Sequence, residues 1–208
     1  MAGPIELRHD AYVATSSAAP VIALVASAGG LAAVSRVLDD LPLGFPFSVL
    51  VLVHSSPDHA SVLPELLATR TRLAVRAACD GDRLDAGSVL VAPPAFHTLV
   101  TPDRRVSLVR SGSFPPSRPS ADLLFTTMAT SLGPDAIGVV LSGGGTDGAT
   151  GATAIHKHGG IIMATNEATS QAFSMPDATI RRDNIQPLVV PLDAVGSRLV
   201  NLGTTGRL

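Results

Sequence analysis

The chain of 208 residues is long enough for one domain with a sizeable hydrophobic core. Apolar residues make up 46% of it and charged residues 15%, which excludes a disordered chain. The formal net charge is -2, no basic block occurs and only 3% of residues are aromatic, so the composition argues against a nucleic-acid partner. The single cysteine, Cys79, excludes an internal disulfide and a cysteine metal site; it fits a reducing compartment and is expected in the core.

The N-terminal residues 1–19 are expected to form a loosely held tail before a domain that covers residues 20–208. Charged side chains such as Glu6, Arg8 and Asp10 stand where a signal peptide requires an apolar stretch. Apolar runs stay shorter than the ~18 residues that a membrane span needs. The sequence therefore predicts a cytoplasmic protein without membrane insertion.

Strands and helices alternate along the chain in the order typical of a parallel α/β sheet. Strands are expected at residues 21–26, 47–54, 73–78, 87–94, 136–141, 161–165 and 187–192. Helices are expected at residues 30–41, 60–70, 121–133 and 148–158. An alternating apolar pattern around the turn signal Pro102-Asp103 predicts a hairpin over residues 96–110. Together these elements predict a doubly wound, mainly parallel sheet with helices on both faces and an antiparallel hairpin near one edge.

Three polar residues stand where a predicted buried strand opens into a loop. Ser27 follows the strand VIALVA, His54 ends FSVLVLVH, and Asp147 lies in the glycine loop after AIGVVL. Active groups collect at the carboxyl ends of the strands in such sheets. Each residue also has a simpler interpretation: Ser27 as a helix cap, His54 as a backbone-bonded strand end, and Asp147 as a cap or turn residue beside Gly148.

The three residue types together favour nucleophilic catalysis. A serine hydroxyl needs a base such as histidine to take its proton, and a carboxylate orients that imidazole. Backbone N–H groups in glycine-rich turns are suited to stabilise an oxyanion. Two turns offer such groups: the first holds Ala28, Gly29 and Gly30, and the second holds Gly143, Gly144 and Gly145. The chain order Ser, His, Asp argues against an α/β-hydrolase, in which the histidine comes last.

Six motifs occur in the order ASAGG, VLVHSS, VLVAPPAFHTLV, RPSADLLF, VVLSGGGTDGATG and TNEATSQAFSMP. Together they resemble the catalytic domain of the chemotaxis protein-glutamate methylesterase (CheB) family. The resemblance implies a serine esterase with the triad Ser27, His54 and Asp147 and with no cofactor or metal. It implies removal of methyl esters from glutamate side chains of a chemoreceptor's cytoplasmic domain, with release of methanol. Many members of the family also deamidate receptor glutamines.

The chain departs from the family pattern at several positions. Ala28 stands where a threonine is usual, Gly144 where a methionine is common, and Ser55 and Ser56 where a methionine and a proline are usual. The family usually carries an N-terminal receiver domain, whereas only about 20 residues precede the first predicted strand here. The sequence therefore predicts a stand-alone form without a receiver domain.

Four further residues are candidates for lining the cleft because they lie in the family motifs or at strand ends. They are His97, Asn166, Glu167 and Met175. A solvent-exposed loop position for His97 and a packing role for Met175 are the alternatives. Arg118 and Asp122 have the spacing of an i,i+4 ion pair, although a helix-capping role is the favoured interpretation.

Two other functions compete with the esterase. Glycine loops between a strand and a helix can hold phosphate, but neither loop matches a nucleotide-binding pattern and neither has a lysine nearby. A catalytically weakened scaffold in a signalling complex is the second alternative, since Ala28 and Ser55 depart from the family pattern.

Overall fold

The computed structural model describes residues 19–56, 58, 61–112, 118–182 and 184–205. Within these residues, seven parallel strands form the central sheet in the order β3-β4-β2-β1-β7-β8-β9. These strands are β1 (Val21–Ala26), β2 (Ser48–Val53), β3 (Ala74–Ala77), β4 (Ser88–Val91), β7 (Ala136–Val140), β8 (Ile161–Thr165) and β9 (Leu188–Val190). The tail predicted for residues 1–19 falls almost wholly outside the described residues.

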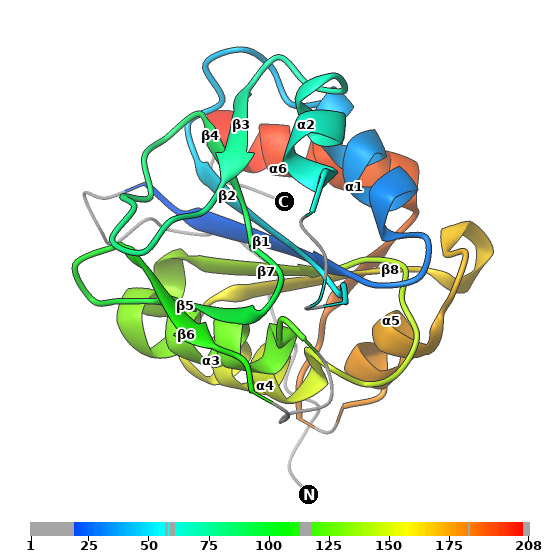
Figure 1. The fold of residues 1–208 in the computed structure, drawn as a ribbon. Coiled ribbons are helices and arrows are strands. Elements are labelled where there is room, and N and C mark those ends of the chain that lie inside the picture. The colour runs from blue at the N-terminus through cyan, green and yellow to red at the C-terminus, as the bar shows by residue number, and fades with distance from the viewer. Residues whose placement is uncertain (1–18, 57, 59–60, 113–117, 183, 206–208) are drawn as a thin grey trace, which may run out of the picture.

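Helices cover both faces of the sheet (Figure 1). On one face lie α1 (Gly30–Asp39), α2 (Leu63–Ala68) and α6 (Leu192–Thr205). On the other lie α3 (Ala121–Leu132), α4 (Ala149–Lys157) and α5 (Ser174–Ile180). The short 3-10 helices η1 (Gly133–Asp135) and η2 (Glu167–Thr169) lie before β7 and after β8. This arrangement confirms the predicted doubly wound fold.

The predicted hairpin is also confirmed. Strands β5 (Phe96–Val100) and β6 (Val106–Arg110) pair antiparallel and form a small sheet of their own. In Figure 1 this hairpin lies alongside α3, on the same side of the main sheet. The hydrogen bond from the Val100 N–H to the Thr127 hydroxyl, 3.1 Å long, joins β5 to α3.

Strand β1 shows why the sheet needs helices on both sides. Its side chains alternate between two hydrophobic clusters, so Val21 and Val25 pack with α3 and α4 while Ile22 and Leu24 pack with α1 and α6. All six residues of β1 are fully buried. A strand covered on both faces reads as an unbroken apolar run, as VIALVA does.

Helices α5 and α6 were not among the elements expected from the sequence. In α6, Val195, Leu199 and Leu202 face the core at helical spacing. The same segment contains Gly196 and Gly203, which lower helix propensity by about 1 kcal/mol each. Tertiary packing of the apolar stripe outweighs this local preference.

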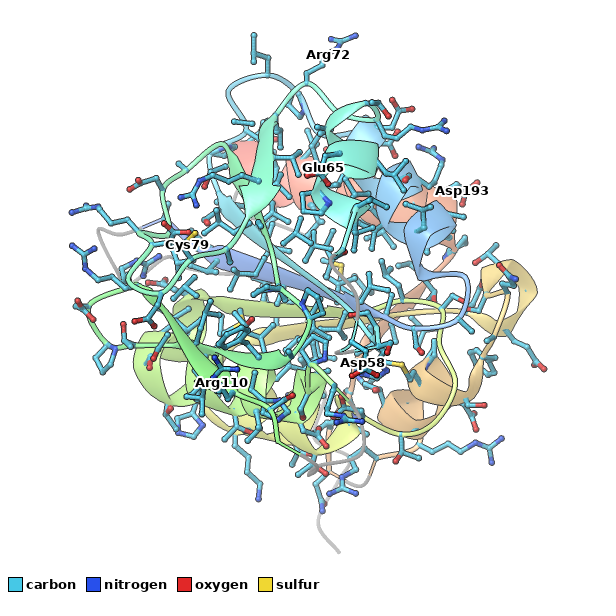
Figure 2. The ribbon with its side chains drawn as sticks, viewed as in Figure 1. Asp58, Glu65, Arg72, Cys79, Arg110 and Asp193 are labelled. Carbon is cyan, nitrogen blue, oxygen red and sulfur yellow. The ribbon has the colours of Figure 1, made fainter. Side chains whose placement is uncertain are left out.

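The expectation that Cys79 is a core residue was wrong. Cys79 is exposed, in the loop after β3 (Figure 2). Its backbone N–H donates to the Asp82 carboxylate over 2.7 Å, so the turn takes the cysteine side chain out of the interior. The preceding Ala78 is the residue that enters the core instead.

No described helix is both long and apolar enough to cross a membrane.

Candidate active site

From β1 the chain adds strands on one side of the sheet, and from β7 it adds them on the other side. The boundary between these two neighbouring strands is therefore the switch point of the sheet. Loops that leave neighbouring strands in opposite directions open a crevice there, where α/β proteins bind ligands. Ser27 follows β1, and the glycine loop that ends at Asp147 follows β7. His54 follows β2, the other neighbour of β1. The three strand-end residues predicted from the sequence therefore lie at one edge of the sheet.

Ser27 lies in a turn fixed by backbone hydrogen bonds. Its N–H donates to the Ser142 carbonyl over 3.0 Å, and its carbonyl accepts from the Gly30 N–H over 2.8 Å. Gly29 completes the turn at a φ of 77°, in the left-handed region that favours glycine. An added Cβ there would lie 2.7 Å from the Gln171 side-chain oxygen, so the neighbouring loop also requires glycine.

His54 is held between the strand ends and Asp147. Its backbone N–H donates to the Ala26 carbonyl over 3.1 Å, and its Nε2 lies 2.8 Å from Asp147 Oδ2. The side chains of this pair are only 15% and 7% exposed, so the interaction is shielded from solvent. The other ring nitrogen of His54 is Nδ1. Among the hydrogen bonds of the described residues, none involves Ser27 Oγ or His54 Nδ1.

Asp147 also accepts hydrogen bonds from the N-terminus of α3. Its Oδ2 accepts from the Ala121 N–H at 2.6 Å, and its Oδ1 accepts from the Asp122 N–H at 3.0 Å and the Ser120 hydroxyl at 3.1 Å. Burial acts to raise the pKa of Asp147. The hydrogen bonds from His54 and the two backbone N–H groups outweigh burial, so this pKa lies below its ordinary value. The carboxylate is therefore charged when it faces the imidazole.

His97 lies behind the site and does not line the crevice. It is 4% exposed on β5, and its Nδ1 accepts from the Ser120 N–H over 3.1 Å. Ser120 in turn donates its hydroxyl to Asp147. Within the described residues, His97 Nε2 is buried without a hydrogen-bond partner. Both interpretations made from the sequence, a solvent-exposed loop position and a cleft-lining role, were wrong, because β5 folds under the start of α3.

Within the described residues, each of the two glycine turns has one backbone N–H group that is bonded and two that are not. Gly30 donates to Ser27, and the Gly143 N–H donates to the Ala172 carbonyl over 2.8 Å. Within the described residues, the backbone N–H groups of Ala28, Gly29, Gly144 and Gly145 make no such bond. Of the six residues expected from the sequence to offer oxyanion donors, Gly30 and Gly143 have N–H groups that are already bonded, so the other four remain as candidates.

Met175 packs against the second glycine turn. It is fully buried, and its N–H donates to the Gly143 carbonyl over 3.0 Å. An added Cβ at Gly143 would lie 2.2 Å from Met175 Sδ and 3.1 Å from Ser27 Cβ. Met175 therefore supports the wall of the site from behind, which agrees with the packing alternative.

A cavity lies beside Ser27, and sequence reasoning predicted its glycines but missed Leu31, Leu66, Arg70 and Gln171. This cavity has a volume of about 740 Å³ and lies between the Ser27 turn, α1 and α2. Its lining includes Gly29, Leu31, Leu66, Arg70 and Gln171. Gln171 lies in the motif NEATSQAFSMP, which was the available signal. Asn166 and Glu167 of the same motif do not line it; Asn166 Oδ1 caps η2 by accepting from the Thr169 N–H over 3.1 Å.

The Arg118–Asp122 ion pair considered from the sequence is not formed. Arg118 donates to the Gly112 carbonyl over 2.8 Å. Asp122 Oδ1 instead accepts from the N–H groups of Gly148 and Gly151, at 3.0 and 2.8 Å. The capping alternative was right, but the helix that Asp122 caps is α4, not its own.

Comparison with known proteins identifies the family. The profile of the CheB methylesterase family matches residues 22–199. The chain belongs to the CheB methylesterase family. The crystal structure of the Thermotoga maritima CheB methylesterase catalytic domain superposes with a TM-score of 0.83 at 26% identity, covering 89% of this chain and 99% of that one.

Curated relatives agree with this assignment. A protein-glutamate methylesterase/protein-glutamine glutaminase 2 from Methanosarcina acetivorans is 34% identical over 95% of this chain and 57% of its own length. A protein-glutamate methylesterase/protein-glutamine glutaminase 1 from Myxococcus xanthus is 38% identical over 90% of this chain and 55% of its own length. The chain thus spans about half the length of the curated relatives it matches.

The described residues contain no cluster of His, Cys, Asp or Glu side chains that could hold a metal ion.

Proposed function

We propose that this chain is a serine hydrolase that removes methyl esters from glutamate side chains of a protein, with Ser27, His54 and Asp147 as its triad. The observation that carries the proposal is the 2.8 Å contact between His54 Nε2 and Asp147 Oδ2, at strand ends next to the Ser27 turn. Membership of the CheB methylesterase family supports it. The proposed domain covers residues 20–208.

The residues can carry out the reaction in two steps. Ser27 Oγ attacks the ester carbonyl carbon while its proton passes to His54 Nδ1. The charge that develops on the carbonyl oxygen is met by backbone N–H groups from Ala28, Gly29, Gly144 or Gly145. The C–O bond to methoxide then breaks, and methoxide leaves as methanol with the proton from His54.

Water completes the cycle. Neutral His54 takes a proton from the water molecule, whose oxygen attacks the acyl-serine. The serine oxygen leaves with that proton, and the products are a glutamate side chain and free Ser27. If the substrate is a glutamine, ammonia replaces methanol as the leaving group, which fits the double names of the relatives. The proposed partner is the cytoplasmic domain of a methylated chemoreceptor, and the proposed compartment is the cytoplasm.

The proposal is tested by methanol release from methylated chemoreceptor membranes, comparing the protein with Ser27→Ala. Release by the protein and none by the variant supports the proposal. Equal release by both removes Ser27 from the mechanism. If neither releases methanol, a fluorophosphonate probe distinguishes the remaining cases. Serine-dependent labelling then indicates a hydrolase with another substrate, and lack of labelling indicates an inactive scaffold.

A further inference from the structure

Helices α3 and α4 exchange caps at their N-termini. Asp147, just before α4, accepts hydrogen bonds from the first N–H groups of α3. Asp122, in the first turn of α3, accepts from the N–H groups of Gly148 and Gly151 at the start of α4. The N-cap residue of α4 is Gly148, which has no side chain to do this itself. Each carboxylate therefore faces the positive end of the other helix, which is favourable.

These contacts form a closed ring around Asp147. The Asp122 N–H donates to Asp147 Oδ1, the chain continues from Asp147 to Gly148, and the Gly148 N–H donates back to Asp122 Oδ1. The two helices pack closely at Gly151. An added Cβ at this position would lie only 2.5 Å from Phe125 Cβ. The ring leaves the Asp147 carboxylate little room to move away from His54.

The negative charge of Asp122 lowers the stability of the folded protein. Burial raises its pKa, and repulsion by the Asp147 carboxylate raises it further, against the hydrogen bonds from Gly151 and Gly148. A carboxyl whose folded pKa is raised contributes stability below its unfolded pKa and loses it as the pH rises through the folded value. Charged Asp122 thus lowers stability at neutral pH. An asparagine oxygen could accept the same hydrogen bonds without this cost, so capping alone does not require the charge.

We propose that Asp122 is a positioning residue for the triad. It fixes Asp147 through the ring of hydrogen bonds and adds a negative charge behind the Asp147–His54 pair. That charge favours the imidazolium formed when the serine gives up its proton. Among the described residues, the charged or titratable groups on and around these elements include His97, which accepts from the Ser120 N–H, and Arg182, which donates to the Thr150 and Thr153 hydroxyls of α4. Arg118 lies just before α3, and His156 and Lys157 lie in the last turn of α4. This inference rests on the proposed function.

The test compares the protein with Asp122→Asn and with Asp193→Asn, a control at the start of α6 on the far face of the sheet. The measurement is the rate at which a fluorophosphonate labels Ser27, taken from pH 5 to 9. In this reaction a bond forms between Ser27 Oγ and phosphorus, the P–F bond breaks, fluoride leaves, and the serine proton passes to His54. Thermal midpoints at pH 7 are measured on the same samples.

We expect Asp122→Asn to label about three- to tenfold more slowly at the plateau, because a weaker base takes the serine proton. Its acid limb should lie at lower pH, since the imidazolium loses a stabilising charge. Its thermal midpoint should equal or exceed that of the unchanged protein, and Asp193→Asn should match the unchanged protein in rate and acid limb. This combination separates a role in catalysis from a role in folding.

Other outcomes overturn the inference in distinguishable ways. An unchanged rate and acid limb in Asp122→Asn would leave Asp122 as a helix cap. Slower labelling with a lower thermal midpoint would assign the effect to lost structure. Labelling that persists in Ser27→Ala would overturn the triad itself, and this inference with it.

Discussion

The Ser142 hydroxyl donates to the Ala28 carbonyl over 2.7 Å and so joins the loops that follow β7 and β1. The same oxygen accepts from the Ala172 N–H over 2.9 Å, which brings in the loop before α5. One side chain thus holds together three loops around Ser27. An added Cβ at Gly29 would lie 2.9 Å from this hydroxyl, so the hydroxyl is closely packed against the Ser27 turn.

Replacing Ser142 by alanine should destabilise the protein by about 1–3 kcal/mol, because a carbonyl and an N–H lose their partner in a largely buried place. Labelling of Ser27 by a fluorophosphonate should slow as well, since the loops are no longer tied. The control is Ser197→Ala, whose exposed hydroxyl bonds, among the described residues, to the Ala194 carbonyl of its own helix. Urea unfolding of both variants checks this, and equal midpoints would contradict it.

Replacing Asp147 by asparagine should reduce turnover on the order of 10⁴-fold, because the amide cannot hold the imidazole as the carboxylate does. The variant keeps an oxygen that can accept from the start of α3. Methanol release from methylated receptor membranes is the measurement, with KM determined separately from kcat. A loss below tenfold would leave Asp147 as a structural cap and would argue against the triad.

The same variant should show a stability difference that depends on pH. The pKa of Asp147 is lowered on folding, so its charge stabilises the protein above its unfolded pKa of roughly 3.9 and ceases to do so as the pH falls through the lower folded value. The gap in unfolding free energy between the protein and Asp147→Asn should therefore be widest above about pH 5. Urea unfolding from pH 2.5 to 7 measures it, and a gap that does not narrow at low pH would contradict the assignment.

Adding a methyl group at Gly151 should separate α3 from α4. The new Cβ would meet Phe125 Cβ at 2.5 Å and the Asp122 carbonyl at 2.9 Å, so Gly151→Ala should cost about 1–3 kcal/mol. Gly144→Ala is the matched control, since its Cβ would meet no atom within 4 Å and its φ is not positive. Thermal unfolding compares the two. A Gly151→Ala protein as stable as its control would show that the helices can move apart freely.

The strand ends were the part of the site that the sequence could predict. A buried parallel strand is an unbroken apolar run, so the first polar residue after it marks the carboxyl edge of the sheet. Ser27 and His54 were found in this way. Asp147 was found because glycines mark the loop around it.

Contacts between distant segments could not be predicted in the same way. Asp122 has the spacing of an ion pair with Arg118, but the position of α4 decides that its carboxylate caps the neighbouring helix. Helix α6 was missed because two glycines hide its apolar stripe. Cys79 was misplaced because it lies in a turn that is held by hydrogen bonds to Asp82 and to more distant residues such as Val106. In each case tertiary packing outweighs the local signal.

The pairing of β1 has a consequence for how the protein acquires its activity. β1 lies between β2, which follows it closely in sequence, and β7, which comes more than 100 residues later. Closing so long a loop is slow compared with local pairing. A chain in which only β1 and β2 had paired would bring together the strand ends that precede Ser27 and carry His54, with Asp147 not yet in place. With the proposed triad, Ser27 would become reactive only after β7 has paired with β1 and has brought Asp147 to His54.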